Sequence, residues 1–143
     1  MQSNTIPLSP KKLWAGRIIS GLAALFLVMD GVMKLVKTTP VVEATVKLGY
    51  SESVILPLGI VLLASTIIYV IPRSSVLGAI LLTGYLGGAV ATHLRVGDPL
   101  FSHVLFPVYL GVLILLGLYL RDDRLSALIP LRGGNETKGA SGA

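Results

Sequence analysis

Long apolar runs separated by short polar breaks are the feature that most constrains this sequence. Hydrophobic residues make up 53% of the 143 residues, and charged residues only 13%. A soluble domain of this size cannot bury so much apolar surface, because a large share of a small fold stays exposed. A helix of roughly 20 residues crosses the hydrocarbon core of a bilayer. The sequence therefore predicts an all-α, multi-pass membrane protein whose main partner is the lipid bilayer.

Four apolar runs are long enough to span a membrane and predict a four-transmembrane-helix bundle. They extend from about Leu13 to Val36, Val54 to Ile71, Val76 to Leu94 and Phe101 to Leu120. We expect residues 1–12 to form an N-terminal cytoplasmic tail and residues 13–122 the membrane domain. Residues 123–143 are expected to form a cytoplasmic tail that is largely disordered, because the stretch "RGGNETKGASGA" is polar and rich in glycine.

The first run differs from a cleaved signal peptide, although Lys11 and Lys12 precede it. It is too long, it contains Asp30 and Lys34, and no small-residue cleavage site closes it. We therefore expect this segment to be retained as the first membrane helix.

Lysine and arginine residues are distributed unevenly between the two ends of the predicted helices. One end carries Lys11, Lys12, Arg17, Arg73, Arg121, Arg124, Arg132 and Lys138, and the other carries Lys37, Lys47 and Arg95. The positive-inside rule then places both termini in the cytoplasm. Aromatic residues are expected at the membrane interfaces, namely Trp14, Tyr69 and Tyr119 on the cytoplasmic side and Tyr50 and Phe101 on the outer side. Because the basic residues do not form one patch, a nucleic-acid partner is not expected.

The connection between the first two runs, Thr38 to Ser53, is too long for a tight hairpin. It is half apolar, and Glu43 and Lys47 lie at the i,i+4 spacing of a helix. We expect a short amphipathic helix that lies on or dips into the outer face of the membrane.

Small residues form a stripe along the third run and predict close helix packing. The stripe consists of Gly84, Gly87, Gly88 and Ala91, at i, i+3, i+4 and i+7. Gly84 and Gly88 make a small-xxx-small motif, which lets helix backbones approach closely. Gly31, on the small face of the first run, is expected to pack in the same way. If the third helix continues far enough, Arg95 extends the stripe.

An acid and a base inside the first run are the most unusual polar residues of the sequence. The predicted topology gathers a polar cluster near the outer interface, formed by Asp30, Lys34, Glu43, His93, Arg95 and His103. Unpaired charges at this depth are costly, so acids and bases should neutralise one another. We expect Asp30 to accept hydrogen bonds from both Lys34 and Arg95.

Two interpretations of this cluster remain open. Lys34 and the histidines can simply extend to the headgroup region, or the cluster can form a ligand-binding or proton-handling site, since histidine titrates near neutral pH. A metal site of His93 and His103 with Asp98 or Glu43 has no ligand-spacing motif, and both histidines lie near the membrane edge, which disfavours haem. The chain has no cysteine, no phosphate-binding loop and no nucleophile elbow. No catalytic residue, metal or cofactor is therefore expected.

The stretches "DGVMKLV", "VVEATVKLGYSES" and the block from Pro57 to Asp98 that ends in "ATHLRVGD" resemble the DoxX-like family of small, mostly bacterial membrane proteins. The similarity extends from Arg17 to Asp122. It implies a four-helix bundle with a lateral segment after the first helix, in the bacterial cytoplasmic (inner) membrane. The founding member is similar to a subunit of a thiosulfate:quinone oxidoreductase. Many relatives carry an acid shortly after the glycine of the second helix, but Gly59 is followed here by apolar Ile60, Val61 and Leu62.

Three classes of function follow from the sequence and the resemblance. The first, which the lack of cysteine and of a flavin or metal motif favours, is a non-catalytic membrane subunit or accessory partner of a redox complex. The second is a quinone-contacting oxidoreductase subunit. The third is a small-molecule carrier that acts as a homo-oligomer, since four helices without an internal repeat are few for a carrier.

Overall fold

The computed structural model describes residues 9–129 of the chain, and all regular secondary structure in this part of the chain is helical. Its elements are α1 (Pro10–Val36), α2 (Thr39–Lys47), the short 3-10 helix η1 (Glu52–Val54), α3 (Ile55–Val70), α4 (Ser75–Val96), the short π-helix η2 (Leu100–Val104), α5 (Phe106–Arg121) and α6 (Asp123–Leu128). The predicted all-α fold is confirmed.

Four helical segments of residues 9–129 are long and apolar enough to cross a membrane. They are α1, η1 with α3, α4, and η2 with α5. These segments coincide with the four predicted runs, and α2 lies between the first and second of them, where a short helix was predicted. The chain is therefore an integral membrane protein with four spans.

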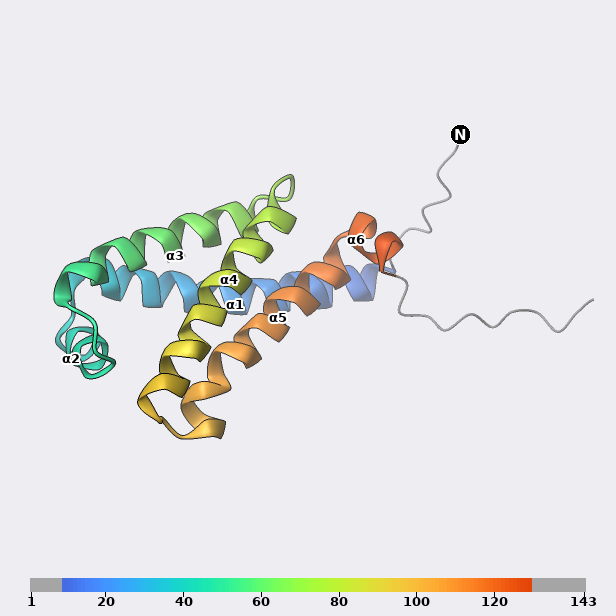
Figure 1. The fold of residues 1–143 in the computed structure, drawn as a ribbon. Coiled ribbons are helices and arrows are strands. Elements are labelled where there is room, and N and C mark those ends of the chain that lie inside the picture. The colour runs from blue at the N-terminus through green and yellow to red at the C-terminus, as the bar shows by residue number, and fades with distance from the viewer. Residues whose placement is uncertain (1–8, 130–143) are drawn as a thin grey trace, which may run out of the picture.

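The four spans form a ring in which each helix packs against two neighbours. α1 packs against α3 and α5, and α4 packs against the same two helices. Figure 1 shows α1 along the whole bundle, α3 beside one half of it, and α4 and α5 as a second pair that crosses α1. α6 lies near the start of α1. α2 and η2 both lie at the other end of the spans, away from α6. We refer to these as the α6 end and the α2 end.

Local sequence signals set the helix boundaries. Pro10 occupies the first turn of α1, where its missing amide proton has no helical partner to lose, and the hydroxyl of Ser9 accepts a bond from the Lys12 amide. Pro72 follows α3 and prevents its continuation. α4 ends at Gly97, whose φ of 74° is easily adopted by glycine. These boundaries determine the depth of every polar residue in the spans.

The core of the bundle is a single apolar cluster along the inner faces of the spans. It contains Ala23, Leu27, Leu62, Tyr69, Ala79, Leu82, Leu86, Leu110, Ile114 and Leu118. The outer faces carry many large apolar side chains that the protein leaves exposed, such as Leu22, Leu25 and Ile80. Such an extensive apolar surface is typical of contact with lipid rather than water.

Close helix packing depends on glycines other than the predicted stripe. A Cβ atom on Gly16 would lie 2.8 Å from the amide nitrogen of Arg121, and one on Gly117 would lie 2.9 Å from that of Ser20, so α1 and α5 meet at glycine. A Cβ atom on Gly31 would lie 2.6 Å from the Leu63 side chain of α3, so α1 and α3 approach closely there. Gly59 of α3 lies on the other side of this same contact between α1 and α3.

The predicted packing role of the α4 stripe is wrong within this bundle. A Cβ atom on Gly84, Gly87 or Gly88 would meet no other atom within 4 Å, and Ala91 is exposed. The reason is geometric: α4 turns a different face toward α3 and α5, and Gly84 and Gly88 border a cavity instead.

Tyr69 is not the interfacial residue that the sequence predicted. Its side chain is completely buried, and its hydroxyl lies 2.8 Å from the Ile114 carbonyl oxygen and 2.9 Å from the Ser20 hydroxyl. Because a carbonyl can only accept, the tyrosine proton is donated to Ile114. Trp14 and Phe101, in contrast, are exposed on their helices, as residues of an aromatic belt would be.

The chain forms a further helix where the sequence predicted the start of a tail. Asp122 caps α6 by accepting hydrogen bonds from the amides of Arg124 and Leu125. The rest of the predicted C-terminal tail from residue 130, including Arg132 and Lys138, and the first eight residues of the N-terminal tail lie outside the described residues.

Candidate functional site

A cavity of about 580 Å³ lies in the α2 half of the bundle and is here called the α2 cavity. Its walls come from α1, α2, the segment after α2, α3, α4 and α5. Most of its lining is apolar, including Phe26, Leu27, Val41, Leu86 and Leu110. Such a volume and lining are typical of sites for small molecules.

Polar groups of the α2 cavity come mainly from two helices. α1 contributes Asp30 and Lys34, and α4 contributes Tyr85, Thr92 and His93. On each helix these residues recur at the spacing of one helical face, so helix geometry alone brings them to the same wall. A few polar groups in an apolar wall can orient a ligand that the apolar surface binds.

Asp30 and Lys34 form the ion pair of the cavity. The Nζ atom of Lys34 lies 2.6 Å from both carboxylate oxygens of Asp30. The side chains are 33% and 16% exposed, so the pair is partly shielded from its surroundings. An acid one turn before a base is the favourable order on a helix, and the predicted Asp30–Lys34 bond is confirmed.

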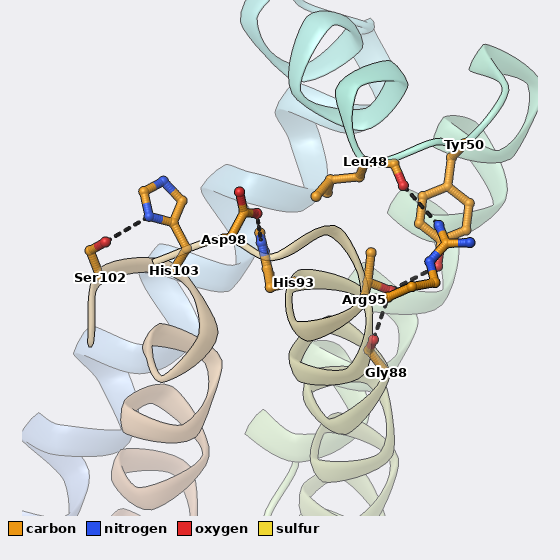
Figure 2. Close-up of polar contacts among 9 residues, drawn as sticks. Leu48, Tyr50, Gly88, His93, Arg95, Asp98, Ser102 and His103 are labelled. Carbon is orange, nitrogen blue, oxygen red and sulfur yellow. Dashed lines mark hydrogen bonds and ion pairs between the residues drawn. The ribbon is translucent and has the colours of Figure 1, made fainter. Parts of the chain in front are cut away.

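The predicted bond between Arg95 and Asp30 is wrong. Arg95 instead donates a hydrogen bond of 2.9 Å to the carbonyl oxygen of Leu48, and its guanidinium group lies 6.0 Å from the centroid of the Tyr50 ring (Figure 2). Leu48 directly follows α2, where carbonyl groups lose their helical partners and need other donors. Arg95 sits in the last turn of α4, so its side chain extends beyond the bundle to this segment.

A second bond connects the same two segments. The hydroxyl oxygens of Tyr50 and Thr92 lie 2.8 Å apart, and the Thr92 hydroxyl also lies 2.9 Å from the carbonyl oxygen of Gly88. Thr92 donates to that carbonyl, so Tyr50 donates to Thr92. Together with Arg95, Tyr50 holds the segment after α2 against α4 and closes one side of the α2 cavity.

The two histidines meet beside the cavity at the loop between α4 and η2. The Nδ1 atom of His93 lies 2.6 Å from Oδ2 of Asp98, and the ring centroids of His93 and His103 are 6.1 Å apart (Figure 2). His103 also pairs with the hydroxyl of its neighbour Ser102, at 2.7 Å. The hydrogen bond from His93 lowers the pKa of Asp98, and the positive charges of His93, His103 and Lys47 act in the same direction.

The predicted polar cluster is therefore divided into separate contacts. Of its six members, Asp30, Lys34 and His93 line the α2 cavity. Arg95 and His103 lie at its margin, in contact with the residues described above. Glu43 is exposed on α2 and forms no ion pair with any of residues 9–129. Within these residues no three His, Cys, Asp or Glu side chains are arranged to hold a metal ion.

The sequence reasoning missed the role of Tyr85. Its side chain is half-buried in the wall of the α2 cavity, and its hydroxyl forms no hydrogen bond with other groups in residues 9–129. A signal was present, because Tyr85, Ala89 and Thr92 lie at i, i+4 and i+7 on α4. Phe26 and Phe106 complete the wall through an edge-to-face contact, with centroids 5.5 Å apart.

Comparison with known proteins bears on the family rather than on the site. No curated protein and no solved structure matches the chain. The model of the DoxX-like family matches residues 18–117, which include most of the first and fourth spans, the whole of the second and third, α2 and the polar residues of the α2 cavity. The chain therefore belongs to the DoxX-like family.

Proposed function

We propose that this protein is a non-catalytic accessory subunit of a membrane redox complex and that it holds a quinone-type molecule in the α2 cavity. The observation that carries the proposal is the cavity itself, which combines apolar walls with the Asp30–Lys34 pair and the Tyr85 hydroxyl. A quinone has an apolar body and carbonyl oxygens that accept hydrogen bonds. Its two parts match the two kinds of surface in the cavity.

The chemistry of the polar groups favours a neutral ligand with acceptor atoms. The ammonium group of Lys34 has three donors, of which two face the carboxylate oxygens of Asp30. The third donor and the Tyr85 hydroxyl are available to a carbonyl oxygen. Because Asp30 already neutralises Lys34, a charged ligand would bring an uncompensated charge into an apolar site, which is costly.

The accessory role is supported by the residues that the chain lacks. Without cysteine, it has no thiol for redox exchange and no thiolate for an iron–sulfur cluster. Electron transfer would then belong to a partner protein, with this chain supplying the quinone site. Purification from native membranes, followed by mass spectrometry of the proteins that remain bound, tests this role. Recovery of the chain without any oxidoreductase subunit would contradict it.

Binding of the quinone can be measured with a short-chain quinone and the purified protein in detergent, corrected for partition into empty micelles. The variant Tyr85→Phe should weaken binding about three- to tenfold, the value of one lost hydrogen bond. Tyr109→Phe is the matched control, because Tyr109 is exposed on α5 and does not line the cavity. Equal affinity of the two variants, or no binding beyond that of micelles, would contradict a quinone in this cavity.

We further infer that the α6 end faces the cytoplasm of a bacterial cell, in the cytoplasmic membrane. Support comes from the basic residues, since Lys11, Lys12, Arg17, Arg73, Arg121 and Arg124 belong to this end of the spans. Reporter fusions after Ala143 and within Val41–Ser53 should give opposite signals, with the cytoplasmic signal after Ala143. The reverse assignment would overturn the orientation.

A further inference from the structure

A second cavity lies at the opposite end of the bundle from the α2 cavity. It has a volume of about 310 Å³ and is here called the α6 cavity. Its lining residues come from the start of α1, the turn before α4, the end of α5 and the start of α6, namely Leu13, Arg17, Pro72, Ser75, Arg121, Asp122, Asp123 and Arg124. Three arginines from three different helices therefore face one small space.

Arg121 is held rigidly in the wall of this cavity. It donates a hydrogen bond of 2.8 Å to the Tyr69 carbonyl oxygen, and its guanidinium group lies 4.7 Å from the centroid of the Tyr69 ring. Its Nε atom is buried and has no hydrogen-bond partner among residues 9–129. The charge of Arg121 is thus fixed in place without being neutralised by a carboxylate there.

Arg17 and Arg124 supply further hydrogen-bond donors to the α6 cavity. Arg17 is exposed on α1 and forms no ion pair within residues 9–129. Arg124 is 73% exposed, and its Nε atom lies 3.6 Å from Oδ1 of Asp122. Both side chains can reorient toward a ligand at little cost, because an exposed or long ion pair contributes little.

The two acidic residues of the cavity offset two of its three positive charges and leave a net charge of +1. The Asp122 carboxylate accepts hydrogen bonds from the amides of Arg124 and Leu125, so it serves as the cap of α6. Asp123 is exposed. The first turn of α4 adds positive potential, because its N-terminus receives no side-chain cap and Ser75 belongs to the wall. The cavity as a whole therefore attracts an anion.

We propose that the α6 cavity binds the phosphate group of an anionic phospholipid. Arginine is well suited to phosphate, because its planar group donates parallel hydrogen bonds. A lipid rather than a soluble phosphate is favoured by position: the cavity lies where the spans end, and Trp14, one turn before Arg17, is exposed as interfacial tryptophans are. Basic pockets between membrane helices commonly bind anionic headgroups.

Thermal unfolding of the detergent-solubilised protein tests this site. Phosphatidylglycerol should raise the midpoint of unfolding by about 3 °C or more, because a ligand that binds only the folded state stabilises it. Phosphatidylcholine, whose headgroup has no net charge, and inorganic phosphate at the same concentration should each produce less than half of this shift. Arg17→Gln and Arg124→Gln should each reduce the shift from phosphatidylglycerol by at least half.

Arg73→Gln is the matched control, since Arg73 is an exposed arginine at the same end of the bundle and does not line the cavity. It should keep the full shift. An equal loss in Arg73→Gln would mean that lipid charge acts on the whole surface, and an equal shift with inorganic phosphate would assign the cavity to a soluble anion. Either outcome, or the absence of any shift, would overturn the proposal. None of these outcomes bears on the proposed quinone site in the α2 cavity.

Discussion

The guanidinium group of Arg121 donates a hydrogen bond to the backbone of Tyr69 and stacks on the ring of the same residue, at 4.7 Å from its centroid. Tyr69 is fully buried, and its hydroxyl contacts Ser20 of α1 and Ile114 of α5. The two residues thus connect α1, α3 and α5 at the α6 end. Polar contacts inside a membrane bundle are among the few interactions that specify how helices pair, because lipid is as apolar as the helix surfaces.

Loss of the Arg121 contact should destabilise the bundle. Arg121→Met keeps much of the side-chain volume but removes the hydrogen bond and the ring contact, and should lower the free energy of unfolding by about 2–3 kcal/mol. Reversible unfolding in mixed micelles measures this loss. Arg73→Met, at an exposed position, should change it by less than about 0.5 kcal/mol. Equal stability of the two variants would contradict the connecting role of Arg121.

Glycine substitutions should separate true packing positions from the α4 stripe. Gly117→Ala places a methyl group 2.9 Å from the Ser20 amide nitrogen and should cost about 1–3 kcal/mol of unfolding free energy. Gly88→Ala meets no atom within 4 Å and should leave stability unchanged or raise it by up to about 1 kcal/mol, since alanine is the better helix former. Unfolding measurements under identical detergent conditions compare them. A larger loss in Gly88→Ala would return the stripe to a packing role, for example between copies of the chain.

Double-mutant cycles should show which of the two residues predicted to bond to Asp30, Lys34 or Arg95, interacts with it. Asp30→Asn combined with Lys34→Met should deviate from additivity by about 0.5 kcal/mol or more, because these residues are in direct contact. Asp30→Asn combined with Arg95→Gln should be additive to within about 0.5 kcal/mol, since Arg95 bonds to Leu48 and shares no partner with Asp30. Strong coupling in the second cycle would show that Arg95 does reach Asp30.

The loop between α4 and η2 should give the protein an acid-sensitive contact. His93 holds the pKa of Asp98 below its ordinary value of 3.8, so ionised Asp98 stabilises the folded state. For an acid with a lowered folded-state pKa, this contribution is present above the ordinary pKa and is lost as the pH falls through the lowered value.

The difference in unfolding midpoint between the native chain and Asp98→Asn should therefore shrink as the pH falls below about 4, where the carboxylate begins to protonate in the unfolded chain. Asp123→Asn is the control, because Asp123 is exposed and forms no ion pair within residues 9–129. A difference that persists at the lowest pH would mean that Asp98 acts without its charge.

Much of the fold could be predicted from the sequence, because in a membrane it depends on local properties. Each span needs only enough consecutive apolar residues to cross the bilayer and to satisfy its own backbone hydrogen bonds. Pro72 and Gly97 mark helix ends for reasons that involve one or two residues. The i,i+4 pair of Asp30 and Lys34, the helical spacing in α2 and the family resemblance follow from the order of residues alone.

The rotation of each helix about its axis was decided only by the tertiary structure. Every span is apolar almost all around, so the sequence contains little information on which face meets another helix and which meets lipid. For this reason Gly84 and Gly88 border a cavity rather than a neighbouring helix, and Tyr69 is buried rather than interfacial. Arg95 reaches Leu48 because the segment after α2 offers an unpaired carbonyl group, and only the folded chain places that group within reach.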